Sequence, residues 1–360
     1  MSFSALALDK SLTDAVKASG YESPTPIQQQ AIPAILAGKD IMAGAQTGTG
    51  KTAAFALPIL QQLIKQTGAL RPIRALILTP TRELAQQVYK SILGYAKNTQ
   101  LNVAVAYGGV SINTQISAIH KGVDILIATP GRLLDHIAKK NVDLSQLQTF
   151  VFDEADRMLD MGFKDEIDQI LNRVPNKRQT LLFSATFDDA IFKLSRTLLN
   201  APTLIEVNER NAAAVQVEQR VYTVDSDRKR ELTSFLIGSK NWQQVLIFTR
   251  TKKMADELAK EMCKDGIQTQ SLHGDKSQGA RERVLAEFKQ GKTRALVATD
   301  LAARGIDIID LKYVINYELP YVAEDYIHRI GRTGRAGNSG LAISLMSPNE
   351  EWLLEAIEKV

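Results

Sequence analysis

The feature that most restricts the fold of this chain is an alternation of short runs rich in β-branched and aliphatic residues with longer amphipathic stretches. Each short run is followed by a polar or glycine-containing turn and then by residues with helical periodicity, as at 82–96 and 187–199. This alternation is typical of parallel sheets covered by helices on both faces. We therefore expect an α/β fold. The runs that we expect to form strands lie at 41–44, 75–79, 102–107, 124–128, 149–153, 180–183, 203–207, 217–224, 244–249, 268–272, 294–298, 312–316 and 341–346.

The alternation is interrupted once, in the segment Asn208–Val215 (NERNAAAV). This segment has no periodicity and no large apolar side chain before its final valine. A chain of 360 residues is long enough for two domains, at about 150 residues per domain. We expect an N-terminal domain over residues 1–207, a linker over 208–215 and a C-terminal domain over 216–360.

The composition excludes several classes of protein. Hydrophobic residues make up 44% of the chain and charged residues 23%, which excludes intrinsic disorder and collagen-like repeats. Cys263 is the only cysteine, so an internal disulfide is impossible, and we expect this side chain to pack on the apolar face of its helix. No apolar run approaches the roughly 18 residues of a membrane helix. The N-terminus, MSFSALALDK, does not read as a signal peptide. We expect a cytoplasmic protein with no membrane partner.

The charge balance says little about the partner. The formal net charge is +4, which permits a polyanionic partner without requiring one, because affinity for such a partner follows local clusters of charge.

A phosphate-binding loop is indicated by AQTGTGKT at 45–52, which lies between an expected strand and a helical stretch. Its glycines permit a tight turn whose N–H groups face a phosphate at the positive end of the helix. We expect Lys51 to meet the β- and γ-phosphates of a nucleotide and the Thr52 hydroxyl to bind Mg²⁺. The first position is alanine where the general pattern has glycine. The other loop residues expected at the phosphates are Gln46, Thr47, Gly48, Thr49 and Gly50.

An acidic group follows the expected strand at 149–153 and reads Asp153-Glu154-Ala155-Asp156. Acids at the carboxyl end of a strand lie where ligands bind in open α/β sheets. We expect Asp153 to hold Mg²⁺ and Glu154 to orient and deprotonate an attacking water. An acidic helix N-terminus is the alternative explanation, and the phosphate-binding loop upstream makes it the weaker one.

The DEAD string at 153–156, beside AQTGTGKT, resembles the DEAD-box RNA helicase family. Further segments resemble the motifs of that family and follow in its order. The sequence around these motifs, including EEWLLEAIEKV at 350–360, most resembles the bacterial RhlE-type branch. The further segments are GYESPTPIQ at 20–28, PTRELA at 80–85, Gly108-Gly109, TPGR at 129–132, SAT at 184–186, LIFTRT at 246–251, ATDLAARGID at 298–307 and HRIGRTGRAG at 328–337.

This resemblance implies two tandem RecA-like domains, each a mostly parallel sheet flanked by helices, with ATP and Mg²⁺ as ligands. Gln28 would bind the edge of adenine, which predicts selectivity for ATP, and Phe3 and Tyr21 would lie at the same base. Gly305 and Asp307 would lie near the ribose and the γ-phosphate. Arg332 and Arg335 resemble arginine fingers, which would require the second domain to meet an ATP held by the first.

The resemblance also implies coupling residues and an RNA track. Asp156, Ser184, Thr186 and His328 would link hydrolysis to domain movement. RNA contacts made by hydroxyls, backbone N–H groups and arginines reach phosphates and 2′-OH groups, so binding would be independent of sequence. For Thr299 and Asp300 an ordinary loop hydrogen bond remains an alternative. The track residues are Thr81, Arg82, Gly109, Thr129, Arg132, Arg250, Gln278, Arg281, Thr299 and Asp300.

These features predict an ATP-dependent RNA helicase. RNA-stimulated ATP hydrolysis would drive local separation of short duplexes and remodelling of RNA–protein complexes, with single-stranded RNA and short duplex RNA as partners. Two alternatives remain open: an ATP-gated RNA clamp or scaffold with slow turnover, and a DNA helicase on the same two-domain plan. Protein partners are conceivable, but the sequence does not name them.

Overall fold

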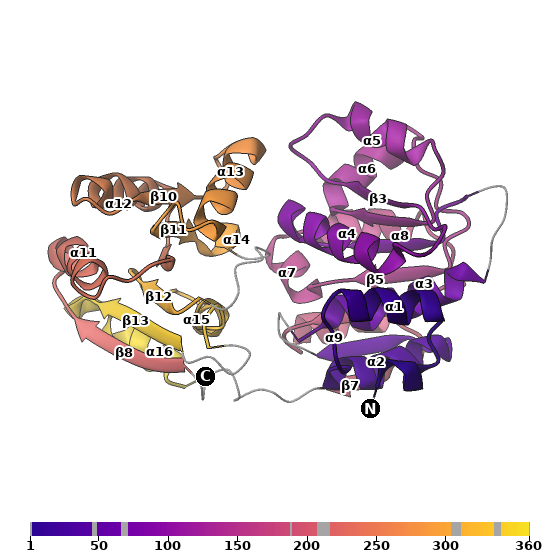
Figure 1. Ribbon diagram of the computed structural model, residues 1–360, viewed down its shortest axis with the longest axis horizontal. Coiled ribbons are helices and arrows are strands. Elements are labelled where there is room, and N and C mark those ends of the chain that lie inside the picture. Colours follow the sequence, from indigo (N-terminus) through magenta and orange to yellow (C-terminus); the bar gives the residue numbers. More distant parts are fainter. Residues whose placement is uncertain are drawn as a thin grey trace. The chain divides into compact units, whose positions relative to one another are not determined.

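The computed structural model describes residues 2–44, 49–65, 71–187, 189–206, 217–303, 311–334 and 340–359. The chain forms two compact units, which divide between Asn208 and Glu209 (Figure 1). Several expected site residues, and the segment 208–215 expected to be a linker, lie outside the described residues. These site residues are Gln46, Thr47, Gly48, Gly305, Asp307 and Arg335.

The first unit contains a seven-stranded sheet in the order β3-β4-β2-β5-β6-β1-β7. Its strand pairs are parallel throughout the described residues, for example Ile41 beside Leu181 and Ile125 beside Ala75. The five interior strands β4, β2, β5, β6 and β1 are almost wholly buried, as expected for a parallel sheet covered on both faces. The strands are β1 (Ile41–Gly44), β2 (Ala75–Leu78), β3 (Val103–Ala106), β4 (Ile125–Ala128), β5 (Thr149–Phe152), β6 (Gln179–Ser184) and β7 (Thr203–Glu206).

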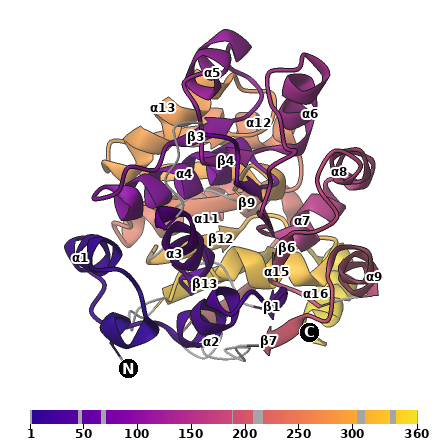
Figure 2. The ribbon, with the colours of Figure 1, turned by 90° about the vertical axis from the view of Figure 1, so that its right-hand side faces the viewer.

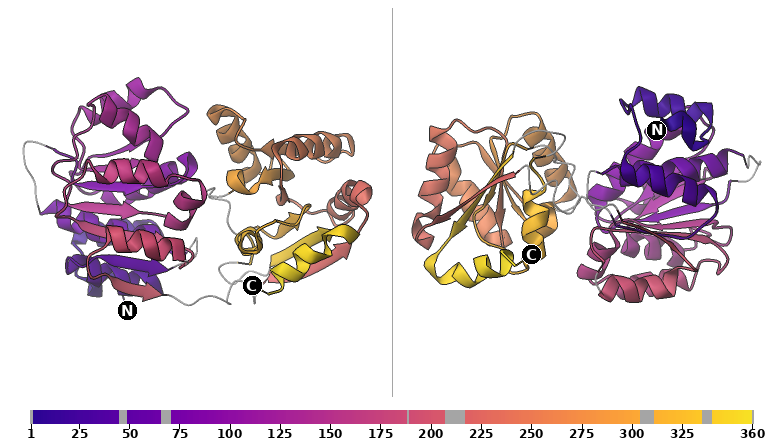
Figure 3. Two further views of the ribbon diagram at one scale, coloured as in Figure 1. Left: turned by 180° about the vertical axis from the view of Figure 1, so that it is seen from behind. Right: turned by 90° about the horizontal axis from the view of Figure 1, so that it is seen from below.

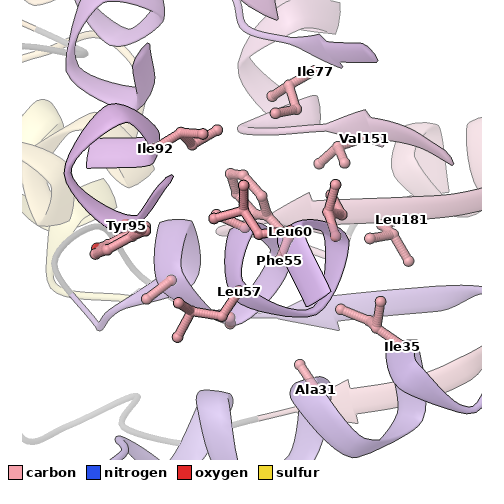
Figure 4. Close-up of a cluster of buried hydrophobic side chains, with 14 of the residues drawn as sticks. Ala31, Ile35, Phe55, Leu57, Leu60, Ile77, Ile92, Tyr95, Val151 and Leu181 are labelled. Carbon is pink, nitrogen blue, oxygen red and sulfur yellow. The ribbon is translucent and has the colours of Figure 1, made fainter. Parts of the chain in front are cut away.

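Two hydrophobic cores lie on opposite faces of this sheet, because neighbouring strand residues point to opposite sides. Ile77, Val151 and Leu181 face α2, α3 and α4 (Figure 4). Phe150, Phe152 and Leu182 face the other side, where they pack with residues of α6 to α9. In Figure 2, α6 to α9 lie on the opposite side of the sheet from α2, α3 and α4. The helices are α1 (Lys10–Ala18), α2 (Pro26–Leu36), α3 (Lys51–Ile64), α4 (Arg82–Ala96), α5 (Ile112–Ile119), α6 (Pro130–Ala138), α7 (Ala155–Asp160), α8 (Lys164–Leu171) and α9 (Asp189–Leu198), with a 3-10 turn at Phe3–Leu6.

The second unit repeats this plan with a six-stranded sheet in the order β10-β11-β9-β12-β13-β8. Its strand pairs are also parallel in the part that the structure describes. The strands are β8 (Val217–Thr223), β9 (Val245–Thr249), β10 (Thr269–Leu272), β11 (Ala295–Thr299), β12 (Tyr313–Asn316) and β13 (Gly340–Met346).

Helices again cover both faces of the sheet (Figure 3). α11 and α12 pack on the face that carries Val245 and Val297, whereas α13 to α16 pack on the face that carries Leu246, Leu296 and Ala342. The helices are α11 (Lys229–Ser239), α12 (Lys252–Lys264), α13 (Gln278–Lys289), α14 (Asp300–Ala303), α15 (Ala323–Ile330) and α16 (Glu351–Ile357), with 3-10 turns at Ser226–Arg228 and Pro348–Glu350.

The expected α/β fold with two sheets is confirmed, and one side chain differs from expectation. Cys263 is exposed, and its Sγ donates to the Thr269 carbonyl oxygen at 3.2 Å. The buried stripe of α12 consists of Ala255, Leu258, Ala259 and Met262. Cys263 lies one turn after Ala259 and about 100° around the helix from Met262, so it stands at the margin of this stripe. Among the described helices, none is long and apolar enough to cross a membrane.

Candidate functional site

Apart from Phe3, Tyr21 and Gln28, which precede β1, the expected site residues of the first unit lie at or after the carboxyl ends of its strands, which a parallel sheet brings to one edge. The strand order separates them into two groups. Lys51, Asp153 and Ser184 belong to the segments at the ends of the neighbouring strands β1, β5 and β6. The residues expected to meet RNA follow the neighbouring strands β3, β4 and β2. One half of this edge therefore carries the expected nucleotide site and the other half the expected RNA track.

Gly50 and Lys51 form the start of α3. Gly50 is the N-cap residue with φ +89°, a left-handed conformation that favours glycine. A Cβ at this position would collide with Nε2 of Gln28. Lys51 is the first residue of the helix and is buried, with Thr52 half-buried behind it. The strand–loop–helix context expected for the phosphate-binding loop is therefore present on both sides of residues 45–48.

Gln28 holds the end of this loop from α2. Its Nε2 donates to the Gly50 carbonyl oxygen at 3.1 Å, and its Oε1 accepts from the Thr25 backbone N–H at 3.0 Å. The Thr25 hydroxyl donates to the Thr49 carbonyl oxygen at 2.8 Å. Gln28 is fully buried. Both ends of the amide that we expect to meet adenine are thus occupied within the protein, so a contact with the base requires an exchange of these hydrogen bonds.

Phe3 and Tyr21, the other residues expected at adenine, contact each other. Their ring centroids lie 6.5 Å apart in an edge-to-face arrangement. The Tyr21 hydroxyl lies 3.3 Å from the hydroxyl of the buried Tyr95. Phe3 is buried and Tyr21 is partly exposed. One aromatic ring near the start of α2 is therefore held in place and open to a ligand.

Lys51 and Asp153 form an unsatisfied pair of opposite charges. Both side chains are buried, yet neither Lys51 Nζ nor Asp153 Oδ1 has a hydrogen-bond partner among the described residues. Burial raises the pKa of Asp153 to about 7, the ammonium of Lys51 acts against this rise, and the neighbouring Glu154 adds to it. Buried polar atoms in native proteins are nearly always paired. These two atoms therefore indicate a ligand that brings a negative group to the ammonium of Lys51 and a cation to the carboxylate of Asp153.

Glu154 is held by Arg157, a residue that we did not expect at the site. Glu154 has φ 54° and ψ 56° at the N-cap of α7, a left-handed conformation rare for a residue with a side chain. The Arg157 Nη1 donates to Glu154 Oε2 at 2.6 Å, and both side chains are buried. Nε and Nη2 of Arg157 have no hydrogen-bond partner within the described part of the chain. The carboxylate expected to activate water therefore has a fixed orientation.

Asp156 connects the acidic segment to the segment after β6. Its Oδ2 accepts from the backbone N–H groups of Ala185 at 3.1 Å and Thr186 at 3.2 Å, and lies 3.4 Å from the Thr186 hydroxyl. The buried Ser184 Oγ has no partner among the residues described. The structure thus brings three of the four expected coupling residues together within the first unit.

The expected RNA residues of the first unit also lie side by side. The guanidinium of Arg82 lies against Gly108 and Gly109, and a Cβ at Gly109, where φ is +83°, would collide with it. Thr81 caps α4 by accepting from the Leu84 N–H at 3.3 Å. Arg132 Nη1 donates to the Val110 carbonyl oxygen at 3.1 Å. Thr129, the N-cap residue of α6, is buried.

In the second unit Asp300 is clamped by Arg329, another residue that we did not expect at the site. Arg329 Nε and Nη2 donate to the two carboxylate oxygens of Asp300 at 2.6 and 2.7 Å. Its Nη1 donates to Asn316 Oδ1 and to the Glu318 carbonyl oxygen. Arg329 is 1% exposed. The carboxylate of Asp300, at the start of α14, is therefore held by a side chain of α15, and Thr299 beside it is buried.

The remaining expected residues of the second unit lie on α13, α15 and the turn after α15. Gln278 begins α13 and is buried, with Oε1 unpaired within the described part, while Arg281 is half-buried on the same helix. His328 Nδ1 lies 4.0 Å from Asp325 Oδ1. Arg332 is buried, two residues after the end of α15. Arg250, which follows β9, has its guanidinium between Glu318 and Glu350.

Comparison with known proteins decides the family. Residues 25–194 match the family model described as DEAD/DEAH box helicase, and residues 227–337 match that of the helicase conserved C-terminal domain. The ATP-dependent RNA helicase CshA of Listeria monocytogenes is 42% identical over 99% of this chain and 68% of that protein. The chain belongs to the DEAD-box family of ATP-dependent RNA helicases. The helicase is also 43% identical to the DEAD-box ATP-dependent RNA helicase RhpA of Helicobacter pylori, over 99% of this chain and 72% of that protein.

Solved structures show the same fold. Dbp5 of S. cerevisiae, bound to RNA and ADP BeF3, is 32% identical, with a TM-score of 0.88 over 99% of the helicase and 93% of that chain. A DEAD box protein from the hyperthermophile Methanococcus jannaschii is 41% identical, with a TM-score of 0.57 over 100% and 96% of the two chains. The two units of the helicase are therefore tandem RecA-like domains, as the resemblance implied.

Three side chains that position the expected residues of the helicase are absent from our sequence-based predictions. Thr25 holds the end of the loop, Arg157 holds Glu154 and Arg329 holds Asp300. Spacing offered a signal for Arg157, which lies three residues after Glu154 on a short helix. Arg329 stands inside HRIGRTGRAG, between two residues that we did single out.

Proposed function

We propose that this helicase couples RNA-stimulated hydrolysis of ATP to the local, sequence-independent separation of short RNA duplexes and to remodelling of RNA–protein complexes. The observation that carries the proposal is the buried pair Lys51 and Asp153, whose Nζ and Oδ1 find no partner in the described residues. A triphosphate supplies acceptors for the ammonium, and a cation bound to it supplies a partner for the carboxylate. The nucleotide would thus satisfy both atoms at once.

Magnesium fits this site. An unpaired buried carboxylate oxygen and a hydroxyl are ligands that Mg²⁺ prefers. Asp153, directly after β5, and Thr52, the second residue of α3, offer them. When bound, the ion would neutralise charge on the phosphates. Lys51 would hold the β- and γ-phosphates, and Phe3, Tyr21 and Gln28 would bind the adenine.

Glu154 is proposed as the general base. Its carboxylate would take a proton from the water that attacks the γ-phosphorus, while the bond from that phosphorus to the bridging oxygen of ADP breaks. The ion pair with Arg157 at 2.6 Å supports this role, because it fixes the carboxylate in a buried position beside Asp153. Arg157 is then a positioning residue for the base.

RNA is proposed to bind along the edge formed by the ends of β3, β4 and β2 and along the corresponding edge of the second unit. The residues there present arginines, hydroxyls and backbone groups, which suit phosphates and 2′-OH groups and read no base. The position of Arg82 supports this proposal. Because Gly108 and Gly109 have no side chains, the guanidinium of Arg82 can lie directly against their backbone.

Coupling is proposed to require both units. Arg332 and Arg335 would neutralise the γ-phosphate, Gly305 and Asp307 would line the same nucleotide, and His328 would reach Asp156 and the 184–186 segment. The hydrogen bonds of Asp156 to Ala185 and Thr186 support a link from the DEAD segment toward these groups. ATP and RNA would each favour a closed state, in which groups of both units hold the ligands. Closure would bend one RNA strand, so its complementary strand would leave.

Two finer assignments also remain proposals. The segment EEWLLEAIEKV and the wording of the motifs support the RhlE-type branch. A cytoplasmic location is supported by the single cysteine, which suits a reducing compartment.

The test is phosphate release measured without nucleic acid, with single-stranded RNA and with DNA of matched sequence, together with ATP-dependent displacement of a labelled strand from a short RNA duplex. We expect RNA to stimulate release strongly and the strand to be displaced. RNA that binds only with ATP and yet leaves release unchanged would identify a clamp. Equal stimulation by DNA would identify a DNA helicase, because 2′-OH contacts would then play no part.

A further inference from the structure

The loop after β12 lies next to the RNA track of the second unit. In the sheet order β10-β11-β9-β12-β13-β8, four neighbouring strands end at the same edge. The first three are followed by residues already expected at RNA: Gln278 and Arg281 after β10, Thr299 and Asp300 at the end of β11, and Arg250 after β9. The fourth is followed by Tyr317–Val322, to which our sequence analysis gave no role. Because β12 lies next to β9, this loop is the neighbour of the Arg250 segment along the same edge.

Tyr321 in this loop is an exposed aromatic residue in contact with a track residue. Its side chain is 68% exposed, and the guanidinium carbon of Arg250 lies 4.6 Å from the centroid of its ring. Arg250 is itself oriented by two carboxylates, because its Nη2 lies 2.8 Å from Glu350 and 3.4 Å from Glu318. The cation therefore lies against one part of the ring, and much of the ring faces solvent.

The loop that carries Tyr321 is fixed on both sides. Glu318 accepts the Arg250 backbone N–H at 2.8 Å, and its carbonyl oxygen accepts from Arg329 Nη1 at 2.6 Å. Arg329 in turn clamps Asp300. Leu319 and Pro320, which follow, are buried. Tyr321 is thus presented on a backbone anchored to two RNA-track residues, so little order would have to be gained on binding.

We propose that Tyr321 is a stacking platform for one base of the bound RNA strand. This inference rests on the proposed RNA track. A base that stacks on the exposed ring would be held whatever its identity, because every base has a π-face, and Arg250 would hold the adjoining phosphate. The contact would add affinity without adding sequence preference, as the helicase function requires.

The experiment measures the affinity of the full chain for a fluorescent oligouridine decamer in the presence of a non-hydrolysable ATP analogue. The variants are Tyr321→Ala, Tyr321→Phe and Tyr321→Leu. The matched control is Phe235→Ala, which removes a similarly exposed ring, 65% exposed, from α11. Loss of one stacked base at an exposed site predicts affinity weaker by about five- to tenfold for Tyr321→Ala and Tyr321→Leu. We expect Tyr321→Phe and Phe235→Ala to match the wild-type protein.

A second arm separates stacking from an indirect effect on Arg250. It uses decamers in which single nucleotides are replaced in turn by an abasic one. With the abasic site at the stacked position, the wild-type protein and Tyr321→Ala should bind equally. Equal weakening of Tyr321→Ala for every oligomer would overturn the stacking assignment and leave a role through Arg250. Wild-type affinity in Tyr321→Leu would overturn it as well. Failure of the proposed function is distinct, because the wild-type protein itself would then show no RNA-stimulated phosphate release.

Discussion

At the scale of single residues, the site is held in conformations that cost energy. Glu154 has a left-handed backbone, which costs about 1–3 kcal/mol and persists only where its surroundings determine it. Here the surroundings are the buried ion pair with Arg157 and the hydrogen bonds of Asp156 two residues later. Lys51 and Asp153 remain partly unsatisfied nearby. We propose that a bound nucleotide completes this arrangement.

Glu154→Gln should separate binding from hydrolysis. The amide keeps the size of the side chain but cannot accept the proton of the attacking water. We expect phosphate release under saturating RNA to fall by about 10²- to 10⁴-fold, while ATP and RNA still bind. Steady-state phosphate release and equilibrium binding of a labelled nucleotide measure the two effects. Asp168→Asn, a change at an exposed residue on α8, is the control. Wild-type turnover in Glu154→Gln would remove this residue from its role.

Gly109→Ala should weaken RNA binding by displacing a neighbouring side chain. The new Cβ would collide with the guanidinium of Arg82, and φ +83° disfavours alanine. We expect lower affinity for single-stranded RNA with little change in nucleotide affinity, measured by fluorescence anisotropy.

Gly94→Ala is the matched control for this change. Gly94 lies on α4 with open space around its Cβ position. Its replacement should leave RNA affinity unchanged and stabilise the protein by about 0.5–1 kcal/mol, because alanine is the better helix former. RNA affinity that stays at the wild-type level in Gly109→Ala would contradict the proposed position of Arg82 on the track.

The residues singled out from sequence are those whose type suits the expected chemistry. Of the three side chains that were missed, Arg157 holds a neighbour three residues away, whereas Thr25 and Arg329 hold partners distant in sequence. Thr25 and Gln28 hold the end of the phosphate-binding loop some twenty residues away, at Thr49 and Gly50. Arg329 reaches back to Asp300. No local pattern predicts such pairs, because they depend on which strands become neighbours in the sheet. The conformation of Glu154 is hidden for a similar reason, since glutamate rarely adopts it.

At the scale of elements, the strands were the most predictable part of the fold. β2, β4 and β5 are buried on both faces and read as continuous apolar runs, so their positions agree with those expected. Helix ends were less predictable. A helix was expected over 187–199, whereas α9 spans Asp189–Leu198, and α3 already begins at Lys51, inside the expected loop 45–52. Periodicity describes the middle of a helix, whereas its ends depend on capping groups such as Thr81.

A buried ion pair joins the start of α11 to the turn before α16. It should make the free energy of unfolding depend on pH in acid. Lys229 Nζ lies 2.7 Å from Glu350 Oε2. Burial opposes ionisation of Glu350, but the hydrogen bonds from Lys229 and the Ser347 N–H outweigh it and lower its pKa below 4.5. A lowered carboxyl pKa stabilises the fold above the unfolded value. We therefore expect the free energy of unfolding to fall as pH drops below about 4.5, the unfolded value.

Lys229→Met tests this pair. Removing one partner of a buried ion pair costs about 3–5 kcal/mol where the other charge is left alone, whereas Glu350 keeps Arg250 at 2.8 Å. Urea unfolding near pH 7 should therefore show a loss of stability below that range and a weaker dependence on acid pH. Lys253→Met is the control, because Lys253 is exposed and lies 3.7 Å from the exposed Glu257. A wild-type acid profile in Lys229→Met would show that Glu350 does not depend on this lysine.

At the scale of the whole molecule, the expected chemistry is divided between two units of similar plan. Lys51 and Asp153 belong to the first and Arg332 to the second, and each unit carries its own part of the proposed RNA track. A ligand that needs groups from both units is sensitive to the equilibrium between them. ATP and RNA would then assist each other's binding through that equilibrium alone.

This division predicts reciprocal coupling between the two ligands. An ATP analogue should raise RNA affinity, and RNA should raise the affinity of the analogue by the same factor, within about 5- to 150-fold. Anisotropy titrations with labelled RNA and with labelled nucleotide measure both sides. Phe235→Ala should show the wild-type factor. Independent affinities would mean that one unit alone binds each ligand.

Because every described strand pair is parallel, the expected site residues that follow strands lie at one rim of each sheet, and among the described residues the opposite rim carries none of them. Gly38 precedes β1 there, and Gly266 and Gly291 precede β10 and β11, all with positive φ and open space around them. Fluorescent dyes, affinity tags or grafted peptides placed at these turns should report on the enzyme at work without obstructing nucleotide or RNA. The same rim is where evolution has room to lengthen the chain between strands at little cost to catalysis.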